Sequence, residues 1–202
     1  AHWGVAYAIG PNYNLPWHLY DPDGRAKALA GAYDATQLAL EYVDGTTPVE
    51  QALINALPAR YPQREPIDDL SPWDKDFTIA MRAVLADHPD DLEVRSVFVE
   101  AIMNETPWKM WDLQTSEVAE DAGTVEAREV LESAFRELPA SWDHPGLLHL
   151  YVHLMEMSPF PELALRAGDQ LRSIMPDGGH LTHMPTHIDV LCGNYRDVVV
   201  YN

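Results

Sequence analysis

The sequence predicts an all-α fold in which helical hairpins stack into a superhelix, or solenoid. Segments of helical length are separated by Pro, Gly and Asp, and no stretch alternates β-branched and polar residues over the length of a strand. Two histidine pairs of equal spacing, His149/His153 and His183/His187, lie 34 residues apart. Because 34 residues is the period of a helix-turn-helix repeat, we expect one domain over residues 1–202 that is part of a longer solenoid.

The breaks place the expected helices in order along the chain. Residues 10–23 are rich in Pro, Asn and Asp, and residues 105–121 contain Pro107, so both are expected to be longer loops. The helices are expected near 1–9, 24–43, 47–59, 73–88, 91–104, 123–138, 145–157, 160–174, 180–192 and from 195 onward.

Charge and cysteine content exclude several classes of function. The net charge of −19 would repel the phosphates of nucleic acid and an anionic membrane surface, so neither is an expected partner. No apolar run has the length of a transmembrane helix. Cys192 is the only cysteine, which excludes an internal disulfide and thiolate metal sites and favours a reducing, cytoplasmic location.

The final third of the chain resembles the tetratricopeptide repeat (TPR). If Pro145 opens a repeat, its two helices cover about 145–158 and 160–174, and Pro176 takes the position of the family's closing proline. The next repeat then begins at Gly179. The resemblance implies a TPR-like superhelix with a concave groove that binds ligands.

Both ends of the chain carry apolar residues typical of unfinished repeat interfaces. Trp3 and Tyr7 lie near the start, and the run Val198-Val199-Val200-Tyr201 lies near the end. Since each repeat of a solenoid is stabilised by its neighbours, we expect further repeats, another chain or a homo-oligomer to cover these ends.

The repeat register places the candidate metal ligands on the groove. A four-residue step puts both imidazoles of a pair on one helix face, and the 34-residue step brings the second pair beside the first. Imidazole with a carboxylate suits transition metals, but Cu, Fe and Zn are not separable on this basis. The expected ligands of one transition-metal ion are His149, His153, His183, His187, Glu156 and His180.

Two glutamates are candidate catalytic groups. Glu156 lies three residues after His153, and Glu100 takes the same register position as His153 in an earlier helix. Either could serve as general base if it does not bind the metal. Glu100, Asp143, Asp189 and Tyr151 are further candidates to orient the imidazole rings by hydrogen bonds.

Pro185 interrupts the second histidine segment. Met184 before it is biased away from helical geometry, so His180 and His183 could precede the helix rather than belong to it. The metal-site prediction therefore depends chiefly on His149, His153 and His187. The remaining histidines are expected to be ordinary hydrogen-bonded residues, with His144 capping the helix that begins at Pro145.

Two segments carry a second resemblance. Asp143-His144-Pro145-Gly146-x2-His149-x-Tyr151-x-His153-x2-Glu156-x-Ser158-Pro159 and Gly179-His180-x2-His183-Met184-Pro185-x-His187 are similar to segments of a group of microbial TPR proteins. Because the group is named for its repeats, the resemblance implies an all-helical fold and no particular substrate.

The sequence favours a metalloenzyme that acts on a small molecule in the groove. An oxidoreductase is slightly preferred over a hydrolase, since sites rich in histidine suit Cu or Fe. The alternative is a TPR scaffold whose groove binds a peptide or protein partner, with the histidines lining the groove for an acidic peptide or small anion. In a third interpretation the metal is a structural staple between repeats.

Overall fold

The computed structural model describes residues 1–202, and the chain is almost entirely helical. It divides into two compact units, Ala1–Pro107 and Trp108–Asn202. The all-α prediction is confirmed, while the prediction of a single domain stays a prediction. No helix combines the length and the apolar character needed to cross a bilayer.

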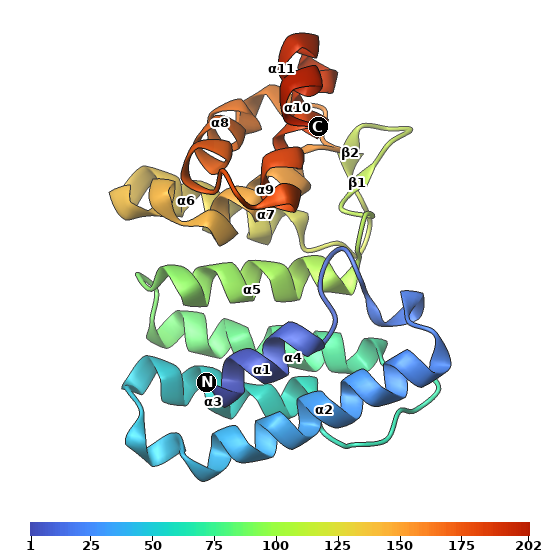
Figure 1. Ribbon diagram of the computed structural model, residues 1–202, viewed down its shortest axis with the longest axis vertical. Coiled ribbons are helices and arrows are strands. Elements are labelled where there is room, and N and C mark those ends of the chain that lie inside the picture. The colour runs from blue at the N-terminus through green and yellow to red at the C-terminus, as the bar shows by residue number, and fades with distance from the viewer. The chain divides into compact units, whose positions relative to one another are not determined.

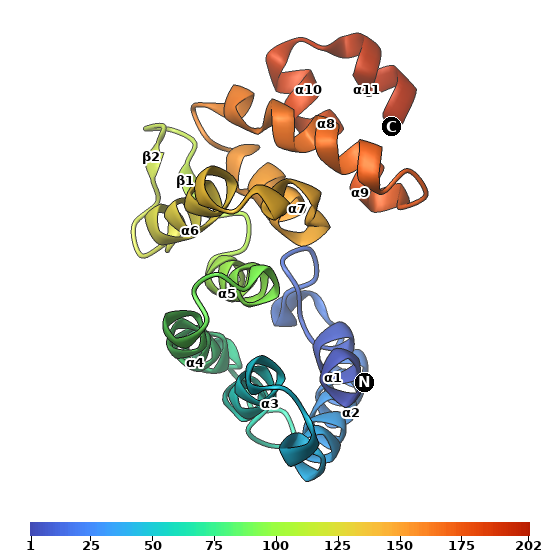
Figure 2. The same cartoon turned by 90° about the vertical axis from the view of Figure 1, so that its left-hand side faces the viewer.

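The first unit is a series of helices in which each packs against the next along the chain (Figures 1 and 2). Two short 3-10 helices, η1 (Trp17–Leu19) and η2 (Val43–Gly45), lie in the connections. The α-helices are α1 (His2–Ile9), α2 (Pro22–Glu41), α3 (Pro48–Arg60), α4 (Ser71–Asp87) and α5 (Leu92–Glu105).

Side-chain caps set where these helices begin. The Asp21 side chain accepts a hydrogen bond from the Gly24 amide at the start of α2. Thr47 and Glu50 form a capping box at the start of α3. Each interaction satisfies backbone N–H groups that have no partner within the helix.

Arg60 ties α3 to the loop that follows α1. It is 1% exposed, and its guanidinium donates to the Pro11 carbonyl at 2.6 Å. The same group lies 4.8 Å from the ring centroids of both Tyr7 and Phe77. Cation–π contact and one hydrogen bond thus stabilise a buried charge among aromatic rings.

The second unit holds both histidine pairs. Its helices are α6 (Thr124–Glu137), α7 (Pro145–Met155), α8 (Leu165–Ile174), α9 (Gly179–His183), α10 (Pro185–Cys192) and α11 (Tyr195–Tyr201), with the 3-10 helices η3 (Pro139–Asp143) and η4 (Pro161–Ala164). α7 packs against α6 and α8, and α10 packs against α8 and α11. This packing brings α7, α9 and α10 together around α8 (Figure 2).

A small hairpin is the one piece of regular structure that the sequence did not predict. β1 (Trp111–Asp112) pairs antiparallel with β2 (Glu117–Val118). The strands are too short to show an alternating pattern. Trp111 is buried, and its indole N–H donates to the Leu154 carbonyl of α7 at 2.7 Å, so this residue belongs to the core of the unit.

The expected helix over 180–192 is divided at Met184. α9 ends at His183, and α10 begins with Pro185 at its first position, where the missing N–H costs nothing. The Met184 backbone nevertheless stays helical, with φ −53° and ψ −42°, contrary to the expected bias away from that geometry. His180 and His183 therefore lie on a short helix that leads directly into the helix that carries His187.

Candidate metal centre

Five histidines of the second unit come together from three helices. α7 contributes His149 and His153, α9 contributes His180 and His183, and α10 contributes His187. Printed side-chain contacts connect these rings into a network with Glu156 and Asn202. All five predicted histidine ligands and Glu156 thus belong to one network.

The start of α7 sets the direction of its two histidines. Pro145 takes the first helical position, and Nδ1 of His144 accepts a hydrogen bond from the Leu147 amide at 3.2 Å. The predicted capping role of His144 is confirmed. From this start, the four-residue step places the rings of His149 and His153 side by side, with centroids 4.5 Å apart.

Three of the imidazoles are close enough to share a metal ion. One ring nitrogen from each of His149, His153 and His180 lies within 4.8 Å of the other two. We call these residues the triad. Nε2 of His149 and Nε2 of His180 are 3.0 Å apart. His153 is 3% exposed whereas His180 is exposed, so the triad runs from the interior of the unit to its surface.

Glu156 follows α7 directly and binds two histidines through its two oxygens. Nδ1 of His153 donates to Oε1 at 3.0 Å, and Nδ1 of His187 donates to Oε2 at 2.5 Å. With Nδ1 protonated in this way, Nε2 of each ring keeps the lone pair that a metal needs. Glu156 therefore does what carboxylates beside metal-bound histidines commonly do, fixing the tautomer and direction of the rings.

His183 and His187 form a second group, which we call the pair. Their Nε2 atoms are 3.0 Å apart. Nδ1 of His183 lies 2.5 Å from Oδ1 of Asn202, and Nδ1 of His187 faces Glu156. Both rings thus present Nδ1 to an oxygen acceptor and Nε2 to each other.

The electrostatics favour neutral imidazoles in the triad and an ionised carboxylate beside them. Burial, with repulsion from His153 and His180, lowers the pKa of His149 to about 3. Burial and the neighbouring histidines also lower the pKa of His180. Burial alone would raise the pKa of Glu156, but hydrogen bonds from His153 and His187 outweigh it and lower this pKa to about 2. Neutral imidazole is the form that binds metal.

His187 behaves differently from the triad. Its hydrogen bond to Glu156 raises the pKa of His187, and burial opposes this effect only in part. The carboxylate favours positive charge on this ring, whether that charge is a proton or a bound cation.

Three residues predicted to orient the rings have other partners. The Asp189 carboxylate accepts from Arg172 at 2.8 Å, the Tyr151 hydroxyl donates to Glu132 at 3.0 Å, and Asp143 accepts from Gln170 at 3.0 Å. The orienting role falls to Glu156 instead. Its spacing of three residues from His153 was the signal for it, because residues i and i+3 share a helix face.

Glu100 lies on α5 in the first unit. Its Oε2 accepts a hydrogen bond from the Tyr7 hydroxyl, and burial raises its pKa to about 7. A carboxyl with that pKa is suited to general-base chemistry. Its predicted role beside the histidines stays a prediction.

A cavity of about 450 Å³ opens beside the pair. His183, His187, Glu156 and Asn202 provide its polar wall. The rest of the lining is largely apolar and consists of Met157, Thr186, Val190, Leu191 and Val198. Polar groups confined to one wall of an apolar cavity are typical of sites that bind small molecules.

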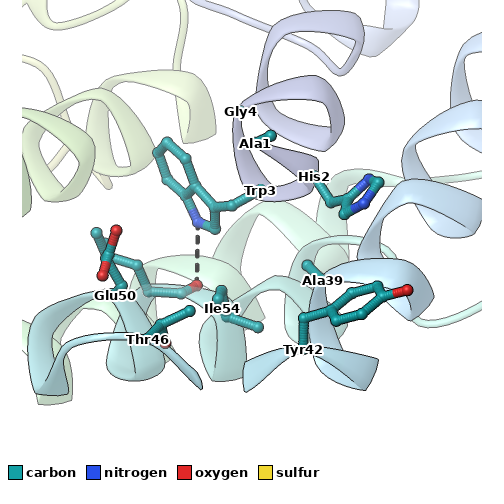
Figure 3. Close-up of a pocket in the computed structure, with 10 residues that line it drawn as sticks. Ala1, His2, Trp3, Gly4, Ala39, Tyr42, Thr46, Glu50 and Ile54 are labelled. Atoms are coloured by element: carbon teal, nitrogen blue, oxygen red, sulfur yellow. Dashed lines mark hydrogen bonds between the residues drawn. The ribbon is translucent and has the colours of Figure 1, made fainter. Parts of the chain in front are cut away.

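A second cavity, of about 330 Å³, lies in the first unit (Figure 3). Its walls include His2, stacked on Tyr42, and Trp3, whose indole N–H donates to the Leu53 carbonyl at 3.1 Å. No second imidazole lines this cavity. His2 is therefore an aromatic packing residue, as the sequence led us to expect of isolated histidines.

No protein-family model, curated protein or solved structure matches the chain. The function is accordingly inferred from the geometry and chemistry of the histidine network.

Proposed function

We propose that this protein is a metalloenzyme in which the triad binds one transition-metal ion and Glu156 orients the ligands. The observation that supports this most directly is the meeting of His149, His153 and His180 within 4.8 Å, with a carboxylate on Nδ1 of His153. Packing alone does not require three imidazoles to meet, whereas a metal ion requires converging lone pairs.

Three protein ligands leave room for a substrate or water on the ion. Three imidazoles are a set found in catalytic zinc sites, and imidazole also suits Cu and Fe. The bound metal would act as a Lewis acid, generate hydroxide or serve as a redox centre. We retain an oxidoreductase as the first expectation and a hydrolase as the second, and the identity of the metal distinguishes them.

The substrate we propose is a small molecule with an apolar body and a polar end. The cavity of about 450 Å³ has the size of a small-molecule site. Its polar wall belongs to the same hydrogen-bonded network as the triad, through Glu156. The apolar side chains of Val190, Leu191 and Val198 would contact the apolar part of the substrate.

For the fold we propose a TPR-like superhelix and, from the single cysteine, a cytoplasmic location. The support for the fold is that helices adjacent in sequence also pack together in space, in each unit separately. Antiparallel hairpins of this kind are the building unit of helical solenoids.

Elemental analysis of protein prepared without an affinity tag tests the metal centre. We expect copurified transition metal, and loss of the ion that the triad holds in His149→Ala, His153→Ala and His180→Ala. His88→Ala, at the end of α4 in the first unit, is the matched control and should keep the metal content of the wild type. Unchanged metal content in all three triad variants would refute the proposal.

A structural staple is the second candidate, because the triad joins α7 to the five-residue helix α9. An ion there would hold a helix too short to be stable alone. Removal of the ion by a chelator would then lower the melting temperature without abolishing any activity. If activity is lost and returns when metal is restored, the catalytic proposal is supported.

A further inference from the structure

We propose that His183 and His187 form a second cation site, distinct from the triad and facing the cavity of about 450 Å³. The proposal extends the metal centre described above from one ion to two. It assigns the ion of the pair to the substrate side of the site, because His183, His187 and Glu156 line that cavity and the triad histidines do not.

The first argument is the position of the protons. Carboxylate and amide oxygens are acceptors, so Glu156 and Asn202 each hold a ring by its protonated Nδ1. A neutral imidazole carries one N–H, and its other nitrogen then carries a lone pair. The two Nε2 atoms therefore direct lone pairs at each other across 3.0 Å. Either an extra proton or a cation must offset that repulsion.

The second argument is distance. Two imidazoles on one ion, with metal–nitrogen bonds of about 2.0–2.1 Å, have their nitrogens about 2.9 to 3.4 Å apart for right-angle to tetrahedral geometry. The observed separation of 3.0 Å between the Nε2 atoms lies within that range. The pair is thus already spaced as two ligands of one ion.

The third argument is that each group has its own support. Glu156 gives one oxygen to His153 of the triad and the other to His187 of the pair. Asn202 supports only the pair. His187 takes no part in the triad, although its spacing from His153 is that of the repeat. The carboxylate therefore links two ligand groups.

With two protein ligands, an ion at the pair retains several positions for water or substrate. A substrate whose apolar body contacts Val190 and Leu191 would place its polar end toward this ion. The substrate class is therefore a small apolar molecule with a carboxylate, carbonyl or hydroxyl end that can coordinate a metal.

The test counts ions. The metal-free full chain is loaded with Zn²⁺ near pH 7.5, and the bound ions are counted by native mass spectrometry and by titration. We expect two ions in the wild type and in the control His88→Ala. One ion should remain in His183→Ala and His187→Ala, which empty the pair, and one in His149→Ala, which disrupts the triad. Circular dichroism verifies that each variant is folded.

The possible failures are distinguishable. No ion in the wild type overturns the proposed function itself. One ion in the wild type that survives His183→Ala and is lost in His149→Ala leaves the triad standing and overturns the second site. One ion that is lost in both variants means a single shared centre, which also overturns the second site.

Discussion

Nε2 of His149 lies 3.0 Å from Nε2 of His180, although 31 residues separate the two histidines in the sequence. His149 is on α7 and His180 is on the short helix α9, so the contact joins two elements that the sequence alone does not place side by side. Interactions that set the position of α9 and α10 should therefore affect the histidine network. The first three predictions below follow from this relationship.

Glu156→Gln should weaken metal binding about 10- to 100-fold, the usual effect of losing a partner that orients a metal-bound histidine. The amide keeps the size of the side chain but loses the charge and one of the two acceptors that hold His153 and His187. Competition with a chromophoric chelator measures the affinity. Glu129→Gln, whose side chain is 70% exposed, is the control and should bind as the wild type does. Equal affinities for both variants would contradict the orienting role.

Asp189→Ala should reduce the free energy of unfolding by about 3–5 kcal/mol, because it leaves Arg172 buried without its charge partner. The two side chains are 7% and 2% exposed and 2.8 Å apart, and they join α8 to α10. Urea denaturation measures the change.

The control for this pair is Asp34→Ala. It breaks the ion pair with Arg64, in which both side chains are 53% exposed, and should cost at most about 1 kcal/mol. Similar losses in the two variants would show that the Arg172–Asp189 pair does not anchor α10.

Gly168→Ala should destabilise the protein by about 1–3 kcal/mol, the usual effect of overpacking, and should also lower metal affinity. A Cβ at Gly168 would lie 3.0 Å from Cβ of Pro185, the residue between His183 and His187. The rigid proline can move only by shifting the junction of α9 and α10.

Gly4→Ala is the matched control, because a Cβ there meets open space. In the interior of α1 this change should stabilise the helix by up to about 1 kcal/mol. Denaturation and chelator competition check both variants. A stabilised Gly168→Ala protein with unchanged metal affinity would rule out the tight contact.

Asp74 should make the stability of the first unit depend on pH. Burial raises its pKa to about 7, Arg60 opposes the shift, and Glu105 and Asp69 add to it. The folded state therefore favours the protonated carboxyl. That stabilisation is fully present below about pH 4, the ordinary range of an aspartate, and is lost as pH rises through 7.

Asp74→Asn removes this titration. Relative to the wild type, the variant should gain stability as pH rises from 4 to 7, by at most about 1.4 kcal/mol for each pH unit. Asp76→Asn, at an exposed position on the same helix, is the control. Denaturation midpoints between pH 4 and 8 check the prediction. A constant difference between wild type and Asp74→Asn across that range would contradict it.

The helices could be predicted because their ends are local events. Pro22, Pro48 and Pro145 occupy first helical positions, and Asp21 and Thr47 cap neighbouring amides, so a few adjacent residues decide where each helix begins. The hairpin at Trp111 was not predictable in this way. Its two-residue strands are stabilised by their pairing and by the contact of Trp111 with α7, which lies far along the sequence.

By itself, the sequence determined the all-α fold, the shared helix face of His149 and His153, and the presence of His180, His183 and His187 opposite them. Only the tertiary structure decided that His180 completes the triad, that His187 pairs with His183, and that Glu156 bridges the two groups. The physical reason is that residue spacing sets direction around one helix axis. The approach of a second helix depends on packing at distant contacts, here between Gly168 and Pro185 and between Arg172 and Asp189.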